Sequence, residues 1–105
     1  MQAIDGLEPP ALWRAFDEIS AIPRESRHEE KIRDFIIQRA RALGHSHACD
    51  AAGNIVVRLS GSGSGTPLIL QAHLDMVCEK TALKGHDFGT DPITLVREGD
   101  FLRAD

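Results

Sequence analysis

The spacing of apolar residues predicts a helix near the start of the chain. Leu12, Phe16 and Ile19 fall at i, i+4 and i+7, which places them on one face of an α-helix. Two consecutive prolines precede this face, and a first helical turn tolerates proline because it does not need the missing N–H donor. Pro23 ends the pattern, because proline disfavours a helical conformation in the residue before it.

A second helix is predicted from Ser26 to Gly44. Ser26 and Glu29 have the spacing of a capping box, in which the hydroxyl accepts the N3 amide and the glutamate returns to the cap amide. Gly44 is suited to end the helix, because glycine adopts the left-handed conformation without a steric cost. The face between these ends is mostly apolar and consists of Ile32, Phe35, Ile36, Arg39 and Leu43.

After Gly44 the pattern changes to short runs typical of strands. We expect strands over residues 45–50 and 54–60, joined by a turn at Asp50-Ala51-Ala52-Gly53. The segment 67–77 opens with the apolar run Leu68-Ile69-Leu70, which indicates a strand covered on both faces.

A hairpin is expected near the end of the sequence. Residues 93–96 and 101–104 are its two strands, and Glu98-Gly99-Asp100 forms the turn. Two helices followed by several strands favour an α/β or α+β arrangement. The strand-like sequence continues to Asp105, which we interpret as the front part of a larger domain.

Composition narrows the class of protein. The 105 residues suffice for one small domain, and 42% hydrophobic with 27% charged residues is ordinary for a soluble globular chain. The formal charge of -4 gives no electrostatic reason to expect nucleic acid or a membrane as partner. The N-terminus lacks a secretory pattern, and Cys49 and Cys78 form no disulfide framework. We therefore expect a cytoplasmic protein with reduced thiols.

The segment that carries candidate chemistry is Gln71-Ala72-His73-Leu74-Asp75-Met76. His73 and Asp75 are two residues apart, so on an extended backbone they point to the same side. Neutral imidazole is a common metal ligand, and a ligating histidine usually donates its other N–H to a carboxylate or carbonyl. The pair is therefore a candidate metal ligand with its orienting acid. The same two residues are also compatible with a hydrogen-bonded pair that holds no metal.

The run from Leu68 to Val77 resembles the first metal-binding motif of the M20 metallopeptidases, in the branch of aminoacyl-histidine dipeptidases (peptidase D, or cytosolic non-specific dipeptidases). The resemblance covers nearly the whole chain, because further segments occur in the same order as in that branch. They are Leu12-Trp13, Ile22-Pro23, Ser26, His28-Glu29-Glu30, Asp50, Gly53-Asn54-Ile55, His86-Asp87-Phe88 and Asp91-Pro92-Ile93.

The resemblance implies a fold, a site and a reaction. Residues 1–105 would be the N-terminal portion of a three-layer α/β catalytic domain around a mixed sheet, without the inserted dimerisation domain. His73 would bind one of two divalent metal ions, most commonly zinc, although cobalt or manganese suits the same ligands. Asp75 would be the catalytic residue that orients and polarises this ligand. The substrates would be Xaa-His and other dipeptides, and the full-length parent would be a homodimer.

The chain departs from the family pattern because the bridging aspartate, the glutamate pair and the remaining ligands do not occur in it. A catalytic zinc needs three protein ligands, so we expect the 105 residues alone to be inactive. Two alternatives stay open. The chain is either a non-catalytic module that packs against a partner, or a part of a related two-zinc tripeptidase or N-acyl amino acid deacylase.

Overall fold

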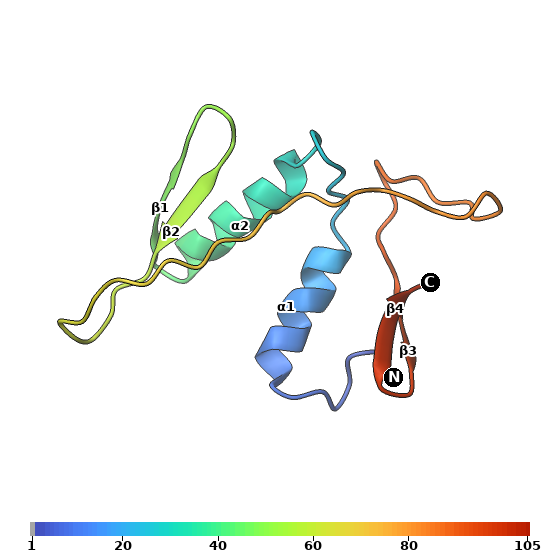
Figure 1. Ribbon diagram of the computed structural model, residues 1–105, viewed down its shortest axis with the longest axis horizontal. Helices are drawn as coiled ribbons and strands as arrows, with labels where there is room; N and C mark the ends of the chain where they lie inside the picture. The colour runs from blue at the N-terminus through green and yellow to red at the C-terminus, as the bar shows by residue number, and fades with distance from the viewer. Residues whose placement is uncertain (1) are drawn as a thin grey trace.

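The structure is a computed structural model that describes residues 2–105, and it consists of two helices followed by two β-hairpins (Figure 1). Each hairpin is a separate two-stranded antiparallel sheet. This order of helices and then strands is the one the sequence predicts. The elements are α1 (Pro10–Ser20), α2 (Glu30–Ala42), β1 (Ser46–Cys49), β2 (Ile55–Arg58), β3 (Leu95–Glu98) and β4 (Phe101–Ala104).

Helix α1 forms where the apolar spacing places it. Pro10 lies in its first turn, where the missing N–H donor costs nothing. At the other end, the Ser20 hydroxyl donates to the Phe16 carbonyl oxygen one turn earlier at 2.7 Å. Ser20 is buried, so this hydrogen bond also satisfies a polar group that lies away from water.

Helix α2 begins at Glu30, so the predicted start at Ser26 and its capping box are wrong. Glu29 is the N-cap residue and makes no side-chain cap hydrogen bond. Its Oε1 instead accepts the backbone N–H of Arg27 at 2.7 Å. Arg27 has a φ of 74°, and this left-handed residue separates Ser26 from the helix.

Both predicted strand pairs are present, although β3 lies over Leu95–Glu98, two residues later than the predicted strand over 93–96. In the first, β1 pairs with β2, and the Asp50 carboxylate accepts the backbone N–H and the side-chain amide of Asn54, each at 2.8 Å. These hydrogen bonds hold the pKa of Asp50 below its ordinary value. In the second, Glu98 of β3 faces Phe101 of β4 across a two-residue turn. Gly99 opens this turn with a φ of 58°, a conformation that favours glycine.

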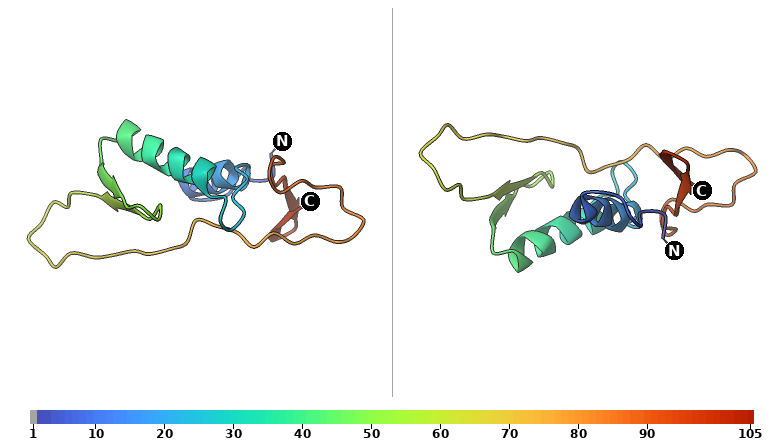
Figure 2. Two further views of the ribbon diagram at one scale, coloured as in Figure 1. Left: turned by 90° about the horizontal axis from the view of Figure 1, so that it is seen from above. Right: turned by 90° about the horizontal axis from the view of Figure 1, so that it is seen from below.

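The predicted strand over residues 67–77 is not formed. Leu68, Ile69 and Leu70 are 85%, 87% and 88% exposed, and the segment runs as an open trace outside both hairpins (Figures 1 and 2). Within this segment Met76 alone pairs, in an isolated parallel bridge with Glu25. An apolar run becomes a buried strand only when other strands and helices cover it, and the described residues do not supply them.

The chain packs loosely for its length. Among the described residues, the buried apolar side chains are Ile4, Ile32 and Ala40. The radius of gyration is 16.2 Å, whereas a compact domain of this length has about 13 Å. The accessible surface is 8500 Å², against about 5,800 Å² for a compact monomer of this size. Much of the apolar surface that a complete domain would bury is therefore exposed.

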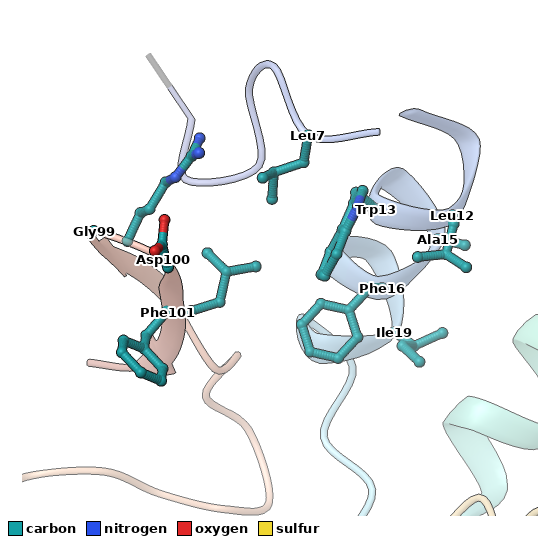
Figure 3. A pocket seen from close by; sticks show the side chains of 11 residues that line it. Leu7, Leu12, Trp13, Ala15, Phe16, Ile19, Gly99, Asp100 and Phe101 are labelled. Atoms are coloured by element: carbon teal, nitrogen blue, oxygen red, sulfur yellow. The ribbon is translucent and has the colours of Figure 1, made fainter. Parts of the chain in front are cut away.

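An apolar groove of about 780 Å³ separates α1 from the β3–β4 hairpin (Figure 3). Trp13 and Phe16 form one wall and meet edge to face, with ring centroids 5.9 Å apart. Phe101 belongs to the opposite wall. The Arg97 guanidinium ties the hairpin to the N-terminal segment by donating to the Asp5 carbonyl oxygen at 2.9 Å. None of the predicted site residues lines this groove. Over residues 2–105, no helix combines the length and apolar character needed to cross a membrane.

Candidate functional site

His73 and Asp75 meet as the sequence predicts. The His73 Nδ1 atom lies 2.9 Å from Asp75 Oδ1 and 2.8 Å from the Asp75 backbone oxygen. Both partners are hydrogen-bond acceptors, so Nδ1 must carry the proton. The neutral ring is therefore the tautomer whose Nε2 has a free lone pair.

The environment of the pair leaves the imidazole open to solvent. The His73 side chain is 81% exposed, whereas that of Asp75 is 33% exposed. No hydrogen bond to Nε2 occurs among the described residues. The ring is thus held at one nitrogen, and the other nitrogen is available to a ligand from solution.

Ser26 completes the site from a distant part of the sequence. Its hydroxyl donates to Asp75 Oδ2 at 2.6 Å, so the two carboxylate oxygens bind different partners. This hydrogen bond is the largest cause that lowers the pKa of Asp75, and the hydrogen bond with His73 is the next. Asp75 is therefore ionised at neutral pH and accepts both hydrogen bonds.

A short stretch of parallel pairing brings the two segments together. The Met76 N–H donates to the Arg24 carbonyl oxygen at 2.9 Å, and the Ser26 N–H donates to the Met76 carbonyl oxygen at 3.3 Å. The Arg24 guanidinium also donates to the Met76 sulfur at 3.6 Å and to the Ile19 carbonyl oxygen. The segment after α1 is thereby fixed alongside the residues that follow His73.

The described residues contain one candidate metal ligand and a candidate orienting acid, and they do not form a complete metal centre. No cluster of three or more histidine, cysteine or acidic side chains that could hold a metal ion occurs within residues 2–105. His73 fits a single ligand position, because its side chain is exposed, its Nδ1 faces a carboxylate, and the neutral ring with Nδ1–H has a free lone pair on Nε2. A catalytic zinc takes three protein ligands, so a zinc centre at His73 would need ligands from outside the described residues.

The other candidate ligands do not join the site. Burial raises the pKa of the Cys78 thiol, and the nearby Glu25 charge raises it further. A raised pKa leaves less of the thiolate that binds metals, and Cys78 is half-buried. The His86 ring packs edge to face against Phe88, with ring centroids 4.8 Å apart, and so anchors its own loop.

The functional residue that the sequence reasoning missed is Ser26, which it assigned to a helix cap. The contact between Ser26 and Asp75 spans 49 positions, so no local pattern indicates it. The one available signal is that Ser26 and the His73–Asp75 motif both belong to the ordered set of segments shared with the dipeptidase branch.

Comparisons with known proteins agree with this resemblance. No family model matches the chain. The cytosol non-specific dipeptidase of Escherichia coli (strain K12) is 37% identical over 107 residues, which include 99% of this chain and 22% of that protein. The crystal structure of aminoacylhistidine dipeptidase from Vibrio alginolyticus matches 97% of this chain with a TM-score of 0.90 and 35% identity.

The chain spans about a fifth of the length of each of these proteins, 22% of one and 21% of the other. The resemblance to the dipeptidase branch is nevertheless confirmed, since both matches cover nearly all of this chain. The mixed α/β fold, with two helices followed by strands, is confirmed as well.

Proposed function

We propose that this chain is the N-terminal portion of the catalytic domain of a metal-dependent dipeptidase. Two observations support the proposal. The proteins that it matches over almost its full length are named as dipeptidases. In addition, the chain carries a histidine whose geometry suits a metal ligand, at the position that the M20 resemblance assigns to one.

The observation that carries the proposal is the arrangement around the His73 imidazole. Asp75 accepts the Nδ1–H at 2.9 Å, which fixes the tautomer and makes Nε2 more basic. His73 would bind one of two divalent cations through Nε2, and Asp75 would orient and polarise the ring. A divalent cation, when bound, polarises the scissile carbonyl and makes water a better nucleophile. Zinc is the cation expected from the resemblance, with cobalt or manganese as substitutes.

The wider assignments follow from the same resemblance. We propose that the substrates are Xaa-His and other dipeptides, that the full-length protein is a homodimer, and that it acts in the cytoplasm. The name of the Escherichia coli relative supports a dipeptidase of the cytosol with broad substrate use. The exposed apolar surface supports a chain that becomes a complete domain only with additional structure.

The test is a chimera in which residues 1–105 replace the matching segment of the Escherichia coli dipeptidase. We expect the chimera to hydrolyse an Xaa-His dipeptide in a zinc-dependent manner, and the 105 residues alone to be inactive. His73→Ala should abolish hydrolysis, because His73 is the metal ligand that the resemblance places in this chain. His47→Ala is the matched control, since His47 lies in β1 and takes no part in the hydrogen bonds of the Asp75 carboxylate.

Two outcomes would contradict the proposal. One is a folded chimera that does not hydrolyse dipeptides, and the other is a His73→Ala variant that retains full activity. The first outcome would favour the alternative of a non-catalytic module, for which the large exposed surface of 8500 Å² is also suited. Hydrolysis of tripeptides or N-acyl amino acids in place of dipeptides would move the chain to a related branch.

A further inference from the structure

The Ser26 side chain precedes a helix but does not cap it. Ser26 could have capped α2, but α2 begins four residues later at Glu30 without a side-chain cap. Its hydroxyl instead donates to Asp75 Oδ2 at 2.6 Å, a short distance typical of a hydrogen bond to an ionised oxygen. The remaining oxygen, Oδ1, faces His73 Nδ1.

The backbone around Ser26 is fixed on both sides. The Ser26 N–H donates to the Met76 carbonyl oxygen, one residue after Asp75, so main-chain and side-chain hydrogen bonds join the same two segments. The next residue, Arg27, has a φ of 74° and donates its N–H to Glu29 Oε1 at 2.7 Å. A left-handed conformation is unfavourable for a residue other than glycine, and such residues are concentrated at functional sites.

We propose that Ser26 is a positioning residue of the metal site. Its hydroxyl holds the Asp75 carboxylate in the rotamer that presents Oδ1 to His73, and thereby keeps Nε2 as the nitrogen that binds a divalent cation. The part of this inference that concerns cation binding rests on the proposed function, whereas the effect of Ser26 on the His73 ring does not.

The structure also limits the size of the effect. The Asp75 backbone oxygen lies 2.8 Å from His73 Nδ1 and offers a second, neutral acceptor for the same proton. Loss of the Ser26 hydroxyl should therefore weaken the selection of one tautomer without abolishing it. Mutation of a residue that hydrogen-bonds a metal-ligating histidine directly typically changes metal affinity by about 10- to 100-fold. Ser26 acts on His73 indirectly, through Asp75. We therefore expect a change of roughly threefold to tenfold at this site.

The experiment measures the ¹⁵N chemical shifts of the His73 ring in the metal-free chain at about pH 8, where histidine is normally neutral. In the unmodified chain, Nδ1 should be the protonated nitrogen. Ser26→Ala should move both ring nitrogens toward the average of the two tautomers, whereas Ser26→Thr, which keeps a hydroxyl, should restore the original shifts. Backbone amide shifts around Ile32 show whether each variant keeps the fold.

The same substitution in a chain that lacks the Asp75 carboxylate shows whether Ser26 acts through Asp75. In Asp75→Ala, the further change Ser26→Ala should leave the His73 ring unaffected, because the carboxylate that connects the two residues is gone. The proposal is overturned if Ser26→Ala changes the ring equally in both backgrounds. It is also overturned if Ser26→Thr changes the ring as much as Ser26→Ala does.

Addition of Zn²⁺ alone to the metal-free dipeptidase chimera, which supplies the ligands that residues 1–105 lack, separates this proposal from the proposed function. Zinc should perturb His73 Nε2, and Ser26→Ala should raise the zinc concentration required by roughly threefold to tenfold. If the tautomer responds to Ser26 as described but zinc leaves His73 unchanged in every variant, the proposed metal role fails while the positioning role stands.

Discussion

Isoleucine occurs at a buried and at an exposed position of this chain, and this contrast gives a direct test of the structure. Ile32, in α2, is 2% exposed, whereas Ile69, in the segment predicted to be a buried strand, is 87% exposed. The same substitution, isoleucine to alanine, can therefore be made at a buried and at an open position. The chemical change is identical, so a difference in the free energy of unfolding reports burial, apart from a small contribution of helix propensity at Ile32.

The expected magnitudes follow from the exposed fractions. Isoleucine to alanine removes three carbon atoms, and burial of each contributes about 0.8 kcal/mol, so Ile32→Ala loses about 2.4 kcal/mol before any cavity forms. The cavity adds to this cost, while the better helix propensity of alanine offsets about 0.4 kcal/mol. We expect a net loss of about 2–3 kcal/mol. For Ile69→Ala, the small covered fraction predicts a loss of about 0.3 kcal/mol.

Urea unfolding followed by circular dichroism measures both values. A loss of 2–3 kcal/mol corresponds to a fall of about 1–2 M in the urea midpoint for a small domain, whereas the Ile69 variant should unfold close to the parent chain. Equal losses at the two positions, or a larger loss at Ile69, would refute the structure. Such a result would mean that residues 67–77 form the covered strand that the apolar pattern predicts.

Further predictions concern the backbone, the thiols and acid sensitivity. Arg27→Val should destabilise the chain by about 1–2 kcal/mol more than Arg27→Gly, because a β-branched residue resists the left-handed φ; equal urea midpoints would contradict this. Cys49 should react with a thiol reagent at about pH 8 faster than Cys78, whose pKa is raised by burial and by a nearby negative charge; variants with a single cysteine give the two rates, and a faster Cys78 would disagree. Because the pKa of Asp50 is lowered in the folded chain, its carboxylate stabilises the fold above the ordinary aspartate pKa of about 4, and this stability is lost as pH falls through the folded pKa. On acidification from about pH 6 to 3, the melting temperature of the parent should therefore fall further than that of Asp50→Asn. Equal falls would show that Asn54 does not stabilise the charged form.

Elements built from nearby residues could be predicted from the sequence. Helix α1 follows from its apolar spacing and its prolines, and the β3–β4 turn follows from a glycine between two strand-like runs. The contact between His73 and Asp75 is also local, because two residues on an extended backbone point to the same side. In each case the decisive interaction lies within a few positions along the chain.

Elements that depend on distant residues could not be predicted. The start of α2 was wrong because the Ser26 hydroxyl has two available partners, and the one that it binds lies 49 positions away. The prediction of a strand over 67–77 was wrong because an apolar run is stable as a strand only when other strands and helices pack against it. The described residues leave this run exposed. An apolar pattern therefore predicts which residues are suited to burial, but not whether burial occurs within the same chain.

The central claim is that His73 binds a divalent cation through Nε2, and a count of bound zinc tests it most directly. The measurement is the zinc content of the dipeptidase chimera that carries residues 1–105, after removal of free metal, with and without His73→Ala. We predict that the substitution removes about one of two zinc equivalents, whereas His47→Ala retains both. An unchanged zinc content in the His73→Ala chimera would contradict the claim.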